Sequence, residues 1–72
     1  MGQDEVLDFL ENNKPLEFTI SMIATHFYLS TNKKPSEFYT LEKTIKIAIM
    51  KLSLNNKIKR KVYGFNVFYS IK

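Results

Sequence analysis

The cations of this 72-residue chain gather toward its C-terminal end, most densely in the segment KIKRK at residues 57–61. Residues 33–72 contain ten lysine or arginine residues and two acidic residues, a net charge of 10 − 2 = +8. Residues 1–32 contain one lysine and five acidic residues, a net charge of 1 − 5 = −4. A basic surface on one side of a small protein is typical of proteins that bind a polyanion, and an ordinary solvated face is the alternative.

The other side chains do not form a recognisable catalytic or metal site. The chain has one histidine, no cysteine and two glycines, which excludes a thiolate metal site and a glycine-rich phosphate loop. His26 could donate to a phosphate, but a lone histidine is more often an ordinary surface residue. Four acidic residues recur at helical spacing near the N-terminus, as paired carboxylates for proton transfer could: Asp4, Glu5, Asp8 and Glu11. An acidic first helical turn with a solvated outer face explains this spacing without any such chemistry. We expect no enzymatic activity, no cofactor and no metal.

Length and composition predict the size and location of the protein. We expect one domain, residues 1–72, which buries about 60% of the surface that its unfolded chain exposes. The chain has no signal peptide and no apolar run of about 18 residues, so we expect a soluble protein without membrane association. The ten-to-one ratio of lysine to arginine is typical of A·T-rich coding sequences, as in archaea, low-GC bacteria and their viruses. We expect a cytoplasmic location, in the host cell if the gene is viral.

Two short helices are predicted in the acidic half of the chain. The first begins at Asp4 as N-cap and ends near Asn13, because Pro15 disfavours a helical backbone at the residue before it. Residues 16–18 are then extended, as a short first strand. Thr19 is a good N-cap for the second helix, whose inner face is formed by Ile20, Ile23, Ala24 and Phe27.

A longer amphipathic helix and a β-hairpin follow a polar turn at residues 30–35. The helix begins at Ser36 and ends at Asn55-Asn56, and the hairpin strands occupy residues 57–62 and 67–71. In the first strand Ile58 and Val62 alternate with lysines, as expected when one face is buried. The inner stripe of the helix consists of Phe38, Leu41, Ile45, Ala48, Ile49 and Leu52. The stripe that points away from the core consists of Tyr39, Lys43, Lys46 and Met50.

This order of elements resembles the winged helix-turn-helix family. In that family a helix of the form T-hydrophobic-x-x-A-L-x-x-L ends at a left-handed residue, and a basic two-stranded wing follows. Asn56 stands at the usual glycine position, Ile58 at the first inward position of the wing and Tyr69 on its return strand. The helix pattern is matched by Thr44, Ile45, Ala48, Ile49 and Leu52. The resemblance covers nearly the whole chain and implies an α+β, mainly α fold with three helices, a short first strand and a two-stranded wing.

The resemblance also implies that the protein binds double-stranded DNA as a small transcriptional regulator. The third helix is expected in the major groove, with contacts from Tyr39, Lys43 and Lys46. The wing is expected along phosphates or the minor groove, with contacts from Lys57, Lys59, Arg60 and Lys61. Lysines favour recognition of phosphates and DNA shape over bidentate base reading, and the single arginine suits a narrow A·T-rich minor groove. Phe65 at the hairpin tip could act as an apolar wedge, although such residues more often fold over their own strands.

A second apolar stripe on the third helix supports a different class of function. Ile47, Met50 and Leu54 recur at i, i+3 and i+7, away from the inner stripe. Either the hairpin folds over Leu54 or another chain covers the stripe, since exposed apolar patches commonly mark interaction sites. The alternative is therefore a winged-helix module for protein interaction or dimerisation, and we expect a homodimer. RNA binding is a third alternative.

Overall fold

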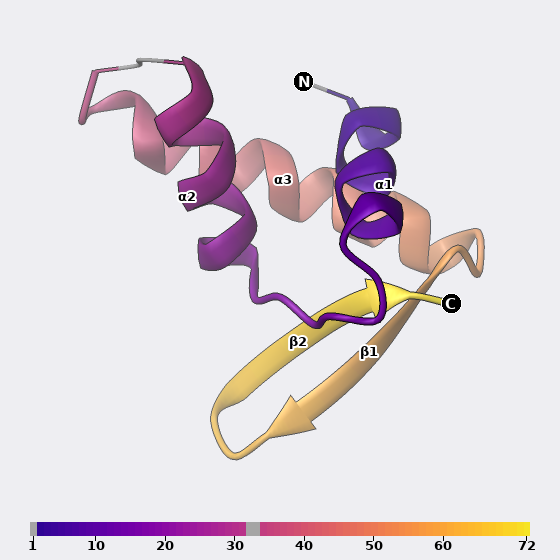
Figure 1. The fold of residues 1–72 in the computed structure, drawn as a ribbon. Coiled ribbons are helices and arrows are strands. Elements are labelled where there is room, and N and C mark those ends of the chain that lie inside the picture. The colour runs from indigo at the N-terminus through magenta and orange to yellow at the C-terminus, as the bar shows by residue number, and fades with distance from the viewer. Residues whose placement is uncertain (1, 32–33) are drawn as a thin grey trace.

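The computed structural model describes residues 2–31 and 34–72, which form three helices followed by a two-stranded antiparallel sheet (Figure 1). The elements are α1 (Gln3–Asn12), α2 (Ile20–Thr31), α3 (Glu37–Leu54), β1 (Ile58–Tyr63) and β2 (Asn66–Ile71). The predicted α+β architecture is confirmed. In the part of the chain described, no helix combines the length and apolarity needed to cross a membrane.

The core forms around the inner stripe of α3, as predicted. That helix packs against both α1 and α2, and the base of the hairpin closes one end of the core. Apolar residues recurring every three or four positions give each helix one face that avoids water, which explains why the pattern predicts the core. The buried residues are Val6, Leu10, Ile23, Ala24, Leu41, Ile45, Ala48, Ile49, Leu52 and Ile58.

The start of α1 differs from the prediction. The N-cap is Gly2, and the predicted cap, Asp4, lies inside the first turn. Glu5 reaches back so that its Oε1 accepts a hydrogen bond from the Gly2 backbone N–H at 3.3 Å, which supports the earlier start. The Asp4 carboxylate still lies at the positive end of the helix dipole. The helix ends at Asn12, close to the predicted Asn13.

The segment between α1 and α2 joins the sheet at a single point. Phe18 and Tyr69 exchange two backbone hydrogen bonds, of 2.8 Å and 2.7 Å, so the predicted first strand is reduced to one bridge. The Lys14–Pro15 peptide bond that precedes it is cis. Thr19 caps α2 as predicted, because its Oγ1 accepts a hydrogen bond from the Met22 backbone N–H at 3.1 Å.

The turn between α2 and α3 starts later than predicted. Ser30 and Thr31 belong to α2, and Ser30 Oγ donates to the Phe27 carbonyl at 3.0 Å. The predicted turn residues 32 and 33 lie outside the described part of the chain. Ser36 is the N-cap of α3, so the helix begins one residue after the predicted start.

Two residues with positive φ connect the last three elements. Asn56 has φ 57° after the end of α3, which confirms the left-handed residue predicted there. Gly64 has φ 62° in a two-residue hairpin loop, where glycine adopts this conformation without a steric penalty. The loop is shorter than the predicted 63–66, because Tyr63 pairs with Asn66.

Val62 is exposed, although its alternation with Ile58 predicts that both face the core. The two residues do share one face of the hairpin, but Val62 is 55% exposed and Ile58 only 6%. The hairpin extends past the helices (Figure 1), and the β1 side of this face is left exposed at Val62. The alternation of a strand identifies its faces but not the point at which the covering helices end.

Candidate nucleic-acid interface

The outward stripe of α3 forms a compact basic surface. Tyr39 is 72% exposed, and Lys43 and Lys46 are exposed beside it. These three residues line one shallow depression together with Glu42 and with Ile20 at the start of α2. The structure therefore brings together all three helix residues that the sequence predicts as DNA contacts.

Glu42 is part of this surface, and the sequence analysis missed it. Ser21 Oγ of α2 donates a hydrogen bond of 2.9 Å to Glu42 Oε2 of α3, which ties the two helices together. The carboxylate also places one negative charge among the cations of the α3 face. Its partner is 21 positions away along the chain, and no local pattern indicates such a pair.

The predicted wing contacts do not form a single patch. All four cations are exposed, but the pleat of β1 places Arg60 on one face, with Val62 and opposite Tyr69, and Lys59 and Lys61 on the other. Lys57 lies just before the strand. The wing therefore presents positive charge on both of its faces.

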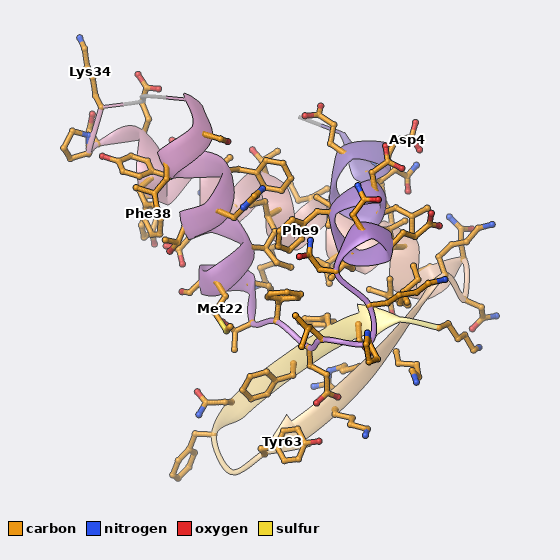
Figure 2. The ribbon with its side chains drawn as sticks, viewed as in Figure 1. Asp4, Phe9, Met22, Lys34, Phe38 and Tyr63 are labelled. Carbon is orange, nitrogen blue, oxygen red and sulfur yellow. The ribbon has the colours of Figure 1, made fainter. Side chains whose placement is uncertain are left out.

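Glu17 partly neutralises one side of the wing. Its Oε2 lies 3.8 Å from Lys61 Nζ, and its Oε1 accepts a hydrogen bond of 3.4 Å from the hydroxyl of Tyr63. Figure 2 shows Tyr63 near the end of the hairpin that lies away from the helices. The bridge between Phe18 and Tyr69 brings Glu17 to this position. The sequence places Glu17 in the acidic half of the chain, so this contact could not be predicted from it.

A second depression connects the α3 surface with the tip of the wing. Both depressions are lined by Ile20, so they adjoin at the N-terminal end of α2. The second is also lined by Thr19, Ser21, Phe65, Asn66, Val67 and Tyr69. The outward face of α3 and the wing tip thus border two shallow depressions that meet at Ile20. No aspartate or glutamate occurs after Glu42, so residues 43–72 carry eight cations and no acid.

The second apolar stripe of α3 is uncovered. Ile47, Met50 and Leu54 are 55%, 57% and 82% exposed, so the hairpin does not fold over Leu54. Ile47 borders a further depression, between α3 and the start of α1, that also includes Asp4 and Lys51. This side of α3 is available to a partner chain.

The single histidine and the acidic residues of α1 lie away from the basic wing in the sequence and are exposed in the structure. His26 is exposed, as predicted, and its ring lies 4.4 Å from that of Phe9, which points from α1 toward α2 (Figure 2). The four acidic residues of α1 are exposed, and two of them, Glu5 and Asp8, line a shallow depression with His26 and Phe27 of α2. Within residues 2–31 and 34–72, no three histidine, cysteine or acidic side chains are grouped as a metal site.

Comparisons with known proteins identify the fold. No family model and no curated protein matches the chain. A solved structure matches it with a TM-score of 0.75 over 97% of both chains, at 16% sequence identity. That structure comes from a study of the DNA recognition and protein interaction domains of HOP2 and their homologous DNA pairing properties. The three helices and the two-stranded sheet of the present chain therefore form a winged-helix fold.

Proposed function

We propose that this protein binds double-stranded DNA through α3 and the wing. The observation that carries the proposal is the acid-free segment 43–72, in which all eight cations are exposed. Lysine and arginine side chains that neutralise phosphates release counterions from DNA, and this release drives association. The likeness in fold to a structure from a study of DNA recognition and protein interaction domains adds support.

In the proposed complex α3 lies in the major groove. An α-helix is about 10–12 Å wide with its side chains, and the major groove of B-DNA is about 12 Å wide. Tyr39, Lys43 and Lys46 are the contacts on the exposed face of the helix. A lysine is a point charge without the paired donors that read guanine, so these residues recognise phosphates and groove shape more than base sequence.

The two basic faces of the wing suit a groove with a phosphate wall on either side. A hairpin lying edge-on along the minor groove turns Lys59 and Lys61 to one wall and Arg60 to the other. The negative potential of a narrow A·T-rich minor groove favours an inserted arginine. We expect Lys57 at the base of the wing to contact an adjacent phosphate. The biological role that fits best is a small cytoplasmic regulator of transcription that acts by binding and has no enzymatic activity.

A second candidate function is dimerisation through the exposed stripe of Ile47, Met50 and Leu54. A two-fold interface pairs one patch with a copy of itself, so a patch with both charge signs can be self-complementary. Asp4 and Lys51 border the stripe at the same depression and provide those signs. The two functions are compatible, because a dimer presents two wings and two α3 helices to one duplex.

The proposal is tested by fluorescence anisotropy with a labelled mixed-sequence DNA duplex. We expect saturable binding at low salt that unlabelled DNA duplex reverses. An RNA duplex of the same sequence should compete less well, because the deep, narrow major groove of A-form RNA does not admit a helix. If RNA competes as well as DNA or better, RNA rather than DNA is the preferred ligand. If the protein does not bind DNA at low salt, the DNA-binding proposal is wrong and the protein-interaction function is favoured.

A further inference from the structure

The aromatic ring at the tip of the wing is fully exposed. Phe65 has a relative exposure of 106%, whereas the sequence favours a ring folded over its own strands. The other phenylalanine of the hairpin behaves as expected, since Phe68 packs edge-on against Tyr63 at 5.4 Å. No ring of residues 2–31 or 34–72 stacks on Phe65. The hairpin therefore completes one aromatic contact of its own, and the ring of Phe65, at its tip, is the most exposed of its large apolar side chains.

The turn holds this side chain at the extreme end of the hairpin. The strands pair as far as Tyr63 and Asn66, so only Gly64 and Phe65 form the loop. A methyl group added at Gly64 would meet no atom within 4 Å, so the loop has open space at this position. The paired strands and the two-residue loop therefore place Phe65 at the tip of the hairpin.

The charges around the tip indicate what kind of surface it meets. Arg60 and Lys61 are the nearest cations along the chain, and the whole hairpin has no acidic residue. Phe65 also borders the depression that adjoins the basic face of α3 at Ile20. The exposed cations favour a polyanionic partner, and the exposed ring of Phe65 favours one that offers a flat apolar slot. The base stack of a nucleic acid meets both requirements.

We propose that Phe65 is a wedge that inserts between two base pairs when the wing lies in the minor groove. This inference rests on the proposed binding to duplex DNA and adds a substrate preference. Apolar side chains that enter the minor groove partly unstack a base step, and this unstacking costs free energy. The cost is lowest where stacking is already weak. The preferred substrate is therefore a duplex with a mismatch or a flexible pyrimidine–purine step.

The chain contains no tryptophan, so Phe65→Trp introduces a single indole at the tip, which can be excited selectively over the four tyrosines. We expect its emission to be strongly quenched when a duplex with a central mismatch is added, because the indole ring stacks on bases. The matched control is Leu29→Trp, on α2, where the native side chain is also exposed. Its emission should change little. DNA anisotropy measured on the same samples reports whether the protein is bound.

Affinity provides a second measurement. We expect the parent protein to bind the mismatched duplex about tenfold more tightly than the matched duplex, because the mismatch lowers the unstacking cost. Phe65→Ala should bring this ratio close to one, and Phe65→Leu, which keeps an apolar wedge, should retain most of it. Circular dichroism spectra should be unchanged, since the ring has no packing to lose.

The outcomes separate this inference from the proposed function. If Phe65→Trp binds DNA by anisotropy but is quenched no more than Leu29→Trp, the wedge is wrong and duplex binding stands. A ratio unchanged in Phe65→Ala would also overturn the wedge. If the parent protein does not bind DNA, the proposed function fails and the wedge fails with it.

Discussion

Replacements of Arg60 distinguish the effect of its charge on DNA affinity from the effect of its guanidinium shape. Arg60→Ala should weaken binding to every duplex and flatten the dependence of log K on log salt by roughly 1, as expected for one lost phosphate contact. Lys14→Ala is the charge-matched control, because Lys14 is exposed in the acidic half of the chain. It should leave the slope nearly unchanged.

Arg60→Lys tests the contribution of the guanidinium itself. Because lysine keeps the charge, we expect Arg60→Lys to bind mixed-sequence DNA about as tightly as the parent protein. We expect it to bind A·T-rich DNA less tightly than the parent protein, because lysine lacks the guanidinium group. The measurement is fluorescence anisotropy on both duplexes. If Arg60→Ala binds as well as the parent protein, Arg60 is not a contact.

Glu17 is the residue whose removal should strengthen binding. Its carboxylate lies 3.8 Å from Lys61 Nζ, so Glu17→Gln frees that lysine for a phosphate while preserving the shape of the side chain. Exposed ion pairs are worth about 0.2–1 kcal/mol, so we expect DNA affinity to rise by up to about fivefold.

The control for this effect is Glu11→Gln in the last turn of α1, which makes the same change in net charge at an exposed residue without removing the ion pair of Lys61. A similar gain from both variants would mean that only net charge matters. In that case the contact between Glu17 and Lys61 has no specific effect on binding.

At the scale of elements, the junction between α3 and β1 depends on Asn56, which has φ 57°. Asn56→Ala should destabilise the protein by about 1 kcal/mol, because a left-handed backbone is costly for a residue with an ordinary side chain. That corresponds to a fall in Tm of roughly 4–8 °C for a domain of this size.

Two neighbouring variants complete the measurement by thermal denaturation. Asn56→Gly should match or exceed the parent Tm, because glycine adopts positive φ without strain. Asn55→Ala should have a smaller effect than Asn56→Ala, since Asn55 has φ −92°. Equal losses from Asn55→Ala and Asn56→Ala would show that the left-handed conformation contributes nothing to stability.

The elements of this chain differ in how far the sequence alone predicts them. The inner stripe of α3, the Thr19 cap and the left-handed Asn56 follow from local rules of periodicity, capping and backbone sterics, and all three are confirmed. Contacts between distant segments do not follow from such rules. The bond from Ser21 to Glu42 and the ion pair of Glu17 with Lys61 arise only when the helices and the hairpin meet.

The candidate site shows the same limit. The exposure of Tyr39, Lys43 and Lys46 is predicted correctly, because it depends on the same helical period as the core. The exposure of Val62 and Phe65 is not predicted by the sequence, because it depends on how far the hairpin projects beyond the helices (Figure 1).

At the scale of the whole molecule, the protein exposes more surface than a compact chain of its mass. Its accessible surface is 5092 Å² for 8.5 kDa. The size scaling of folded monomers gives roughly 4,700 Å². The projecting wing and the uncovered stripe on α3 both contribute to this larger exposed surface. We propose a partner for each surface, DNA for the wing and a second copy of the chain for the stripe.

The proposed dimer is tested by Leu54→Asp. Leu54 is 82% exposed, so the folded monomer should survive the charge, while sedimentation velocity should show a shift from dimer to monomer. DNA affinity should fall as well, because two linked binding sites hold a duplex more tightly than one.

Leu29→Asp is the control, because Leu29 is 70% exposed on α2 and lies outside the stripe. It should leave the dimer intact. A parent protein that sediments as a monomer at high micromolar concentration contradicts the dimer. Unfolding of Leu54→Asp would place Leu54 in the core.

The central claim, that the basic half of the molecule binds DNA through phosphates, is tested most directly by the salt dependence of duplex affinity. If each protomer neutralises about four to six phosphates, the slope of log K against log salt should lie near −4 to −5. Anisotropy titrations of one mixed-sequence duplex across a series of salt concentrations give this slope. A slope near zero, or no binding at the lowest salt, would contradict the claim.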